Sequence, residues 1–254
     1  STTIYPYTSW NCSYIHCAFE NAAATLSGVE TAYRSCKEQG KIKEEYRFIA
    51  FGGDGGTYDI GLQSLSGALE RGHRLIYVCY NNEAYMNTGI QRSGATIKGT
   101  WTTTSPFGNN SYGKKENQKN LTAIAAAHNI PYVAQGSISH WKDLVRKAKK
   151  AFATDGPVFL NVLTPCHRGW RFPMEKTVEI AKLAVQTCMW PLYEVENGKW
   201  NLTVKVRDKK PIEEYLKPQG RFAHLFKKSP EVLAAIQENI DREWEKLLHL
   251  CGEK

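Results

Sequence analysis

Short apolar runs alternate with amphipathic helical patterns along most of this chain. Phe48–Phe51, Leu75–Tyr80 and Val158–Leu163 predict buried strands, because each run is short, continuous and bounded by glycine or polar residues. Between the first two runs, residues 58–71 predict a helix that Gly72 closes. This strand–helix–strand unit predicts two parallel, neighbouring strands joined by a right-handed crossover.

The rest of the chain extends this alternation and then departs from it. Further helices are expected at residues 29–44, 116–128, 141–152 and 175–187, and a short strand at 132–134. Residues 192–206 predict a hairpin around Asn197-Gly198, a pair favoured in tight turns. Residues 211–226 show no regular pattern, and residues 229–250 predict an amphipathic helix that starts at Ser-Pro-Glu.

Together these elements predict an α/β fold, a parallel sheet with helices on both faces. We expect one domain over residues 1–190 and a C-terminal extension over residues 191–254, made of the hairpin, the irregular segment and the last helix. Residues 1–27 carry few charges, which predicts that they are buried or lie at an interface. Residues 83–113 form a long polar loop, and such loops inside compact domains are usually functional.

Composition and charge narrow the class of protein. The 254 residues are 42% hydrophobic, and no apolar run approaches the roughly 18 residues that span a bilayer. The seven cysteines form no regular framework, which argues against a secreted disulfide scaffold and predicts a reducing, cytoplasmic setting. The formal charge of +8 is spread along helical stretches without interleaved aromatic residues, which favours a solvated surface over a nucleic-acid site.

Polar residues follow two of the predicted strands. Asp54 stands in the glycine turn Gly53–Gly56, and Asn81-Asn82 end the next strand. Because adjacent parallel strands end at the same edge of a sheet, Asp54 and Asn82 should lie close together. Hard oxygen ligands of this kind suit a Mg²⁺ ion that carries a diphosphate. The alternative is that the glycines form only a turn.

Two further segments could carry chemistry. Asn87 and Thr88 place a carboxamide and a hydroxyl just past the amide pair, although a plain polar loop would look the same. Cys166 directly follows a buried strand and could ligate iron or act as a nucleophile, or be a buried small residue. No Cys-x-x-Cys pair is present, so the other cysteines are predicted to be structural. These are Cys12, Cys17, Cys36, Cys79, Cys188 and Cys251. The nucleophile elbow, the Walker loop and the dinucleotide fingerprint are absent.

At this point the chain resembles a known family. Gly53-Asp54-Gly55 with Asn81-Asn82 is similar to the thiamine-diphosphate signature. The string Tyr80–Ser93 resembles the β subunit of the pyruvate:ferredoxin oxidoreductase family, also called 2-oxoacid:ferredoxin oxidoreductases. Supporting segments are Ala18–Ala23, Trp101–Pro106, Ala125–Tyr132 and Pro191–Gly198. The resemblance covers essentially the full chain, in order.

The resemblance implies a thiamine-diphosphate-binding fold and a set of cofactor contacts. Asp54, Asn82 and the Ala84 carbonyl would coordinate Mg²⁺, with the diphosphate completing the shell. Asn87 would face the thiazolium ring and the substrate, and Cys166 would be the fourth ligand of a [4Fe–4S] cluster. The backbones that would line the diphosphate are those of Gly53, Gly55 and Gly56.

The family chemistry is oxidative decarboxylation of a small 2-oxoacid, with electrons passed through iron–sulfur clusters to ferredoxin. An α subunit would supply the catalytic glutamate, so this chain alone would be catalytically incomplete. Ferredoxin-like cluster subunits of the γ and δ type are further expected partners. The basic helix at residues 140–150 could help to dock an acidic ferredoxin.

Two departures from the family pattern leave alternatives open. In the family, the other three cluster cysteines belong to a leading segment that these 254 residues lack. We therefore expect that the sequence is a fragment of the subunit, that the segment has been lost, or that a separate chain carries it. His167-Arg168 replaces a smaller Pro-Thr pair expected beside Cys166 in pyruvate-type relatives. Pyruvate with coenzyme A is the default substrate of the family. The basic pair makes oxalate, which needs no coenzyme A, its rival. A non-catalytic structural subunit and a non-oxidative decarboxylase are alternatives of other classes.

Overall fold

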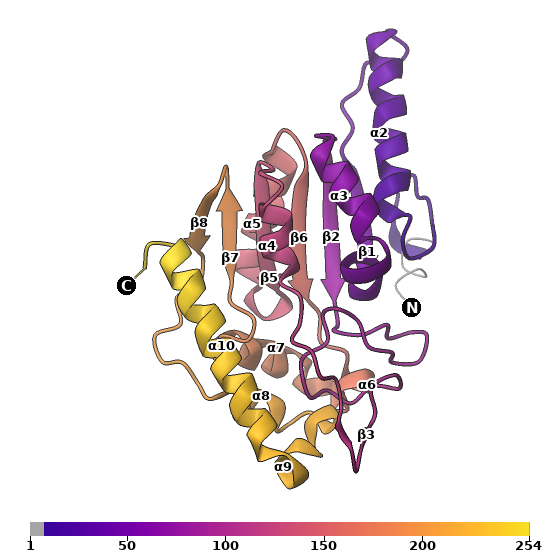
Figure 1. The fold of residues 1–254 in the computed structure, drawn as a ribbon. Helices are drawn as coiled ribbons and strands as arrows, with labels where there is room; N and C mark the ends of the chain where they lie inside the picture. Colours follow the sequence, from indigo (N-terminus) through magenta and orange to yellow (C-terminus); the bar gives the residue numbers. More distant parts are fainter. Residues whose placement is uncertain (1–7, 254) are drawn as a thin grey trace.

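Six strands form one sheet at the centre of the molecule, in the order β1-β2-β6-β5-β7-β8 (Figure 1). The structure is a computed structural model and describes residues 8–253. The strands are β1 (Phe48–Gly53), β2 (Leu75–Asn81), β5 (Tyr132–Ser137), β6 (Val158–Leu163), β7 (Tyr193–Glu196) and β8 (Lys199–Leu202). The four strands from β1 to β5 in this order run parallel, and the hairpin β7–β8 adds two antiparallel strands beside β5. The prediction of an α/β fold built on a parallel sheet is confirmed.

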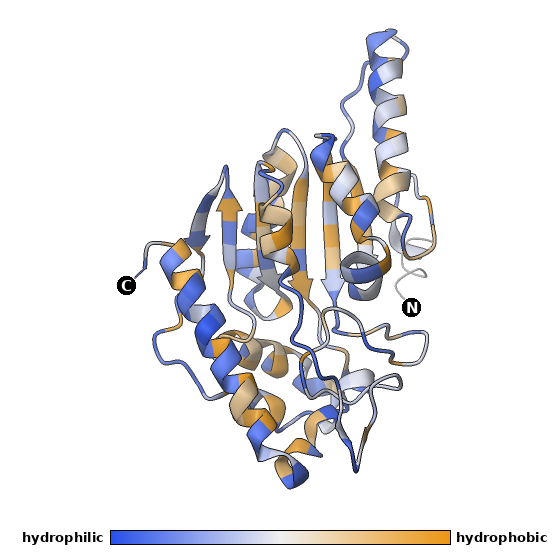
Figure 2. Cartoon of the chain, in the orientation of Figure 1, coloured by the Kyte–Doolittle hydropathy of each residue, from blue (hydrophilic) through white to orange (hydrophobic). Residues whose placement is uncertain are grey.

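Helices cover both faces of the sheet, as expected. The longer ones are α2 (Ala22–Glu38), α3 (Leu62–Glu70), α4 (Leu121–Ala126), α5 (Trp141–Ala153), α7 (Thr177–Gln186) and α10 (Pro230–Leu250). On one face, side chains of α2 and α3 pack against alternate residues of β1 and β2, and α4 packs against β5 and β6. On the other face, α5 packs against the remaining residues of β2, β5 and β6. Figure 2 shows the resulting apolar centre and polar exterior.

Some boundaries differ from those that the sequence predicts. The helix expected at residues 29–44 begins at Ala22, because small residues that we grouped with the uncharged N-terminal segment already form its first turns. It ends before Gly40, which has a positive φ of 69°. The helix expected at residues 116–128 is reduced to α4, since the Asn120 side chain accepts the Ala123 N–H and caps it there.

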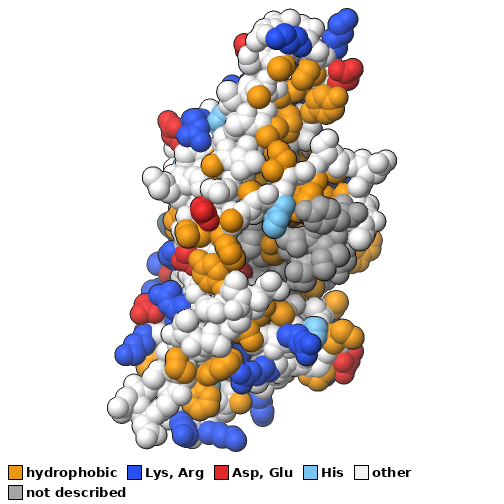
Figure 3. All heavy atoms as spheres, turned by 90° about the vertical axis from the view of Figure 1, so that its right-hand side faces the viewer, with side chains coloured by type: hydrophobic (Ala, Val, Ile, Leu, Met, Phe, Trp, Pro, Cys, Tyr) orange, Lys and Arg blue, Asp and Glu red, His pale blue; other side chains and the backbone are white. Residues whose placement is uncertain are grey.

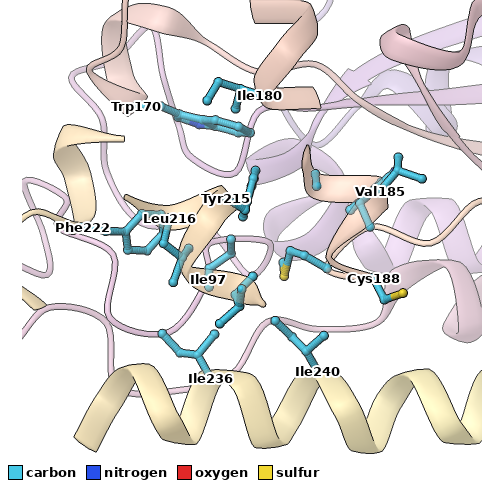
Figure 4. Close-up of a cluster of buried hydrophobic side chains, with 14 of the residues drawn as sticks. Ile97, Trp170, Ile180, Val185, Cys188, Tyr215, Leu216, Phe222, Ile236 and Ile240 are labelled. Atoms are coloured by element: carbon cyan, nitrogen blue, oxygen red, sulfur yellow. The ribbon is translucent and has the colours of Figure 1, made fainter. Parts of the chain in front are cut away.

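The prediction of an irregular segment at residues 211–226 is wrong. It contains α8 (Ile212–Leu216), the 3-10 turn η4 (Gly220–Phe222) and the start of α9 (Leu225–Lys228). Each of these is shorter than the window of about 11 residues over which a helical period can be recognised in a sequence. Their apolar side chains form a second core with α7 and α10, in which Tyr215, Leu216 and Phe222 face Ile236 and Ile240 (Figure 4).

This second core lies beneath the edge of the sheet at which β1, β2 and β6 end (Figure 1). It also contains Ile97 and Leu163, which precede residue 191. Segments on both sides of the proposed domain boundary thus share one sheet and one core. The division into residues 1–190 and 191–254 stays a prediction.

The remaining short elements lie in the connections. They are the π turn η1 (Gly55–Ile60), the 3-10 turns η2 (Ile138–His140) and η3 (Met174–Lys176), the helix α6 (His167–Trp170) and a small hairpin of β3 (Phe107–Gly108) with β4 (Ser111–Tyr112). The prediction for residues 1–27 lies partly outside the described residues. Within the described part, Trp10, Ile15 and Phe19 are exposed, so this stretch is not buried in the chain itself.

The basic helix α5 is largely occupied by contacts within the chain. Lys147 is fully buried and donates to Asp143, to the Gln135 carbonyl and to Thr203. Lys150 forms ion pairs with two glutamates of the hairpin β7–β8. Lys147 therefore cannot contact ferredoxin, and that part of the docking prediction is wrong.

Within residues 8–253, no helix is both long and apolar enough to cross a membrane.

Candidate functional site

Three neighbouring strands deliver the candidate residues to one edge of the sheet. In the parallel register, Gly53 of β1 pairs with Tyr80 of β2, and Asn81 of β2 pairs with Leu163 of β6. The segments that follow these strands contain Asp54, Asn82 and Cys166 in turn. The order of the strands thus places three segments that are far apart in the sequence next to one another.

Three oxygen-bearing groups converge at this edge. The inward-facing atom of the Asn82 carboxamide lies 2.8 Å from the Ala84 carbonyl oxygen and 3.1 Å from Asp54 Oδ1. With the amide nitrogen inward, Asn82 donates to both oxygens. With the amide oxygen inward, Asn82 would face the two other oxygens as a further acceptor, and a cation or a proton on Asp54 would be needed to satisfy them. Asp54, Asn82 and Ala84 are thus brought together as the motif predicts.

The Asp54 carboxylate is almost fully buried and held from two sides. Its Oδ1 accepts the Asn82 N–H at 3.2 Å, and its Oδ2 accepts the Ser93 hydroxyl at 2.5 Å. Burial nevertheless raises the pKa of Asp54 to about 7, because removal from water disfavours the charged form. A divalent cation at this point would favour the carboxylate form.

Packing requires the two glycines after Asp54 but not the one before it. A Cβ on Gly55 would lie 2.3 Å from the Tyr85 ring, whose hydroxyl donates to the Gly55 carbonyl at 2.8 Å. A Cβ on Gly56 would lie 2.7 Å from the Phe19 carbonyl oxygen. At Gly53 the nearest atom would be 3.5 Å away in the Tyr80 ring, which is an ordinary contact. The backbone role of these glycines toward a diphosphate stays a prediction.

Asn87 lies apart from the three oxygens. Tyr85 and Gln91 exchange two backbone hydrogen bonds of 2.9 and 3.2 Å, which closes a tight loop with Asn87 in it. The Asn87 side chain is exposed. It stands on the loop that continues from Ala84, and its role toward a cofactor stays a prediction.

Cys166 is half-buried at the start of the short helix α6. The helix packs onto the loop after Asn82, because a Cβ on Gly169 would lie 2.0 Å from the Met86 sulfur. Within residues 8–253, no group of three or more His, Cys, Asp or Glu side chains is arranged to hold a metal ion. A metal at either predicted position would thus need ligands of other kinds or from other chains.

Sequence reasoning missed several residues that shape this edge. Ser93 holds Asp54, and the Trp170 indole N–H donates to the Asn82 carbonyl at 2.7 Å. Glu83 is buried, has a positive φ of 62° and pairs with the equally buried Arg221. Nothing in the sequence around Glu83 indicates that it is buried. Its partner Arg221 lies 138 residues further along the chain, so that local sequence patterns cannot predict the pair.

Comparisons with known proteins identify the family of this chain. The family described as "Thiamine pyrophosphate enzyme, C-terminal TPP binding domain" matches residues 2–162. Pyruvate synthase subunit PorB of Thermotoga maritima is 58% identical over 254 residues, which span 98% of this chain and 78% of that relative. The subunit of the same name from Methanocaldococcus jannaschii is 53% identical over 251 residues, with 98% and 83% covered.

More distant proteins extend the comparison. Ketoisovalerate oxidoreductase subunit VorB of Pyrococcus abyssi is 47% identical over 249 residues, with 97% of this chain and 79% of that relative covered. Among solved structures, a 2-oxoglutarate:ferredoxin oxidoreductase from Magnetococcus marinus matches with a TM-score of 0.51 at 22% identity. That match covers 65% of this chain and 58% of the other, and it shows likeness of fold alone.

The packing at Gly55 gives a direct test of the turn. We expect Gly55→Ala to lower the free energy of unfolding by about 1–3 kcal/mol, because the new methyl group overlaps the Tyr85 ring. Gly53→Ala is the matched control and should change it by less than about 1 kcal/mol. Denaturant unfolding of the two variants measures both values. Equal losses at the two positions would contradict the steric explanation.

Proposed function

This chain belongs to the family of thiamine-diphosphate-binding β subunits of 2-oxoacid:ferredoxin oxidoreductases, and we propose that it holds the Mg²⁺–diphosphate half of the active site. The observation that carries the proposal is the convergence of Asp54, Asn82 and the Ala84 carbonyl at one edge of the sheet. Membership of this family makes the chain one subunit of a larger thiamine-diphosphate-dependent enzyme.

The spacing of the three oxygens supports Mg²⁺ in particular. Oxygens on adjacent corners of an octahedron about 2.0–2.1 Å from Mg²⁺ lie about 2.9 Å apart. The inward atom of Asn82 lies 2.8 and 3.1 Å from its two neighbours. Mg²⁺ would thus select the orientation of Asn82 with its oxygen inward, and diphosphate and water would fill the remaining positions.

The residues of this chain would bind and orient the cofactor. Asp54, Asn82 and Ala84 would hold the metal that carries the diphosphate, and Asn87 would face the thiazolium ring and the substrate. Thiamine diphosphate, when bound, supplies the nucleophilic carbon and the electron sink that decarboxylation of a 2-oxoacid requires. The backbones of Gly53, Gly55 and Gly56 would line the diphosphate.

The other half of the site would come from an α subunit. The edge strand β1 and the segment before α2 expose large apolar side chains, among them Trp10, Phe19 and Phe51. Figure 3 shows hydrophobic side chains gathered on this side of the molecule. Exposed apolar clusters of this kind mark interfaces. They lie beside the strand end that bears Asp54, where a second chain could close over the cofactor.

Cys166 would be one ligand of a [4Fe–4S] cluster that receives the electrons. It is half-buried at the same edge of the sheet, and its helix packs on the loop that follows the metal ligands. The other three cysteines would come from residues beyond this sequence or from another chain. Ferredoxin-like subunits of the γ and δ type, and then ferredoxin, would take the electrons onward.

Pyruvate, with coenzyme A as acyl acceptor, is the proposed substrate, and oxalate remains the second candidate. The pyruvate synthase subunits of two organisms are more than half identical to this chain. Arg168 is exposed and His167 half-buried beside Cys166, so positive charge stands close to the cysteine. That charge is the observation that keeps the more anionic oxalate under consideration.

Removing the Asp54 carboxylate should abolish Mg²⁺-dependent binding of the cofactor. We expect Asp54→Asn to weaken thiamine-diphosphate binding by the assembled complex at least about 100-fold, because the metal loses its charged ligand. Asp59→Asn is the matched control, since Asp59 lies on the same turn but pairs with Lys119. Calorimetric titration at fixed Mg²⁺ measures both affinities. Unchanged affinity in Asp54→Asn would sink the metal assignment and favour a non-catalytic subunit.

Replacing Cys166 should remove one cluster. We expect Cys166→Ser to lower the iron content of the complex by about four atoms per copy of this chain, with equal loss of labile sulfide. Cys251→Ser, near the C-terminus, should keep the full content. Iron and sulfide analysis of the purified complexes decides the matter. Full cluster content in Cys166→Ser would reject the ligand role and reopen the non-oxidative decarboxylase.

Turnover assays distinguish the two substrates. We expect the complex to reduce ferredoxin with pyruvate only when coenzyme A is present, and to show little activity with oxalate. The assay follows ferredoxin reduction with each acid, with and without coenzyme A. Oxalate oxidation that is independent of coenzyme A would replace pyruvate as the substrate.

A further inference from the structure

We propose that Arg221 and Glu83 are positioning residues for the metal-binding loop. Their buried ion pair fixes the backbone of Glu83, the one residue between the ligands Asn82 and Ala84, so that both ligands face the same point. The inference rests on the proposed function, because it concerns the loop that would hold Mg²⁺.

The pair is built in a way that stability alone does not explain. Arg221 Nη2 lies 2.6 Å from Glu83 Oε2, and both side chains are at least 98% buried. Glu83 Oε1 accepts no hydrogen bond within residues 8–253. A buried ion pair with an unsatisfied oxygen is often no more stable than apolar side chains of the same size. Its placement therefore calls for a role in geometry.

The backbone of Glu83 is held in the conformation that turns the loop. Its φ of 62° lies in the left-handed region, which a residue other than glycine adopts only when its surroundings impose it. The Glu83 N–H donates to Asn81 Oδ1 at 2.9 Å, and the Glu83 carbonyl accepts the Thr96 hydroxyl at 2.6 Å. The chain reverses here, and the Ala84 carbonyl comes within 2.8 Å of the Asn82 side chain.

Arg221 is also connected to the backbone of Asn82, through the Trp170 side chain. Its guanidinium lies 3.8 Å from the centre of the Trp170 ring, and the Trp170 indole N–H donates to the Asn82 carbonyl at 2.7 Å. Arg221 thus reaches the loop through the Glu83 carboxylate and through the Trp170 ring. A planar guanidinium can form the ion pair and the ring stack together, whereas a lysine ammonium ion cannot.

Arg221 is itself anchored in the C-terminal layer. Its Nε donates to Gln219 Oε1 at 2.9 Å, and its carbonyl accepts the Trp101 N–H at 3.1 Å. Gln219 in turn donates to the Tyr215 carbonyl at 2.6 Å. The layer formed by α8 and η4 therefore provides a fixed support for the loop.

The test measures the Mg²⁺ concentration that gives half-maximal binding of thiamine diphosphate to the cofactor-free assembled complex. We expect Arg221→Met to raise this concentration about 10-fold or more, as loss of an outer-shell partner does in metal sites. Glu83→Gln should give a shift of similar size, and the double variant should add little to either. Calorimetry or quenching of intrinsic fluorescence reports the binding without any activity assay.

Lys147→Met is the matched control, because it removes another fully buried cation from an ion pair far from the loop. It should lower the thermal unfolding midpoint while the Mg²⁺ requirement stays within about twofold of the wild type. An unchanged Mg²⁺ requirement in Arg221→Met would overturn the inference. If Arg221→Met does not assemble, the same Mg²⁺ concentration is measured for Arg221→Lys. An increase of about threefold or more supports the inference, and no increase overturns it.

Asp54→Asn separates this inference from the proposed function. If Asp54→Asn keeps Mg²⁺-dependent binding, the metal site itself is wrong. If it loses that binding while Arg221→Met shows no shift, only the positioning role of Arg221 fails.

Discussion

The structure of the site depends on one electrostatic constraint, the crowding of acceptor oxygens at the end of β1 and β2. The partly buried Asn82 carboxamide lies about 3 Å from an oxygen of the buried Asp54 carboxylate and from the Ala84 carbonyl oxygen. Without a cation, two changes relieve that crowding. Asp54, whose pKa is raised, can take up a proton, and Asn82 can turn its amide nitrogen toward the two oxygens. A cation removes the need for both.

Such a constraint needs rigid support, and the chain provides it from three directions. The Tyr85 ring fills the space over Gly55, so that the turn and the following loop are locked together. Ser93 holds the second carboxylate oxygen of Asp54. From below, Trp170 holds the carbonyl of Asn82. Each support comes from a segment distant in sequence, and each is largely or fully buried, which keeps the loop in one arrangement.

The sequence predicts the sheet, and the proximity of Asp54 and Asn82, for different physical reasons. Val158–Leu163 is apolar except for Asn161 and β6 has the same limits, because a strand buried on both faces leaves a nearly continuous signal. Asp54 and Asn82 could be placed together because parallel strands end at one edge. Local patterns could not find α8 and η4, which are shorter than the window of about 11 residues over which a helical period can be recognised. Nor could they pair Glu83 with Arg221, since only the folded chain brings these residues together.

The segment that carries Cys166 packs closely against the loop that follows Asn81. The Thr164 N–H donates to the Asn81 carbonyl at 2.8 Å, two residues before the cysteine. Gly169 leaves room for the Met86 sulfur, and a larger residue there would require the Met86 side chain to move. Under the proposed function, the cofactor and the first electron acceptor would therefore be held at a distance set by these contacts rather than by a flexible link. A displacement of the loop would move the cysteine segment with it, so that cofactor binding and electron transfer depend on the same packing.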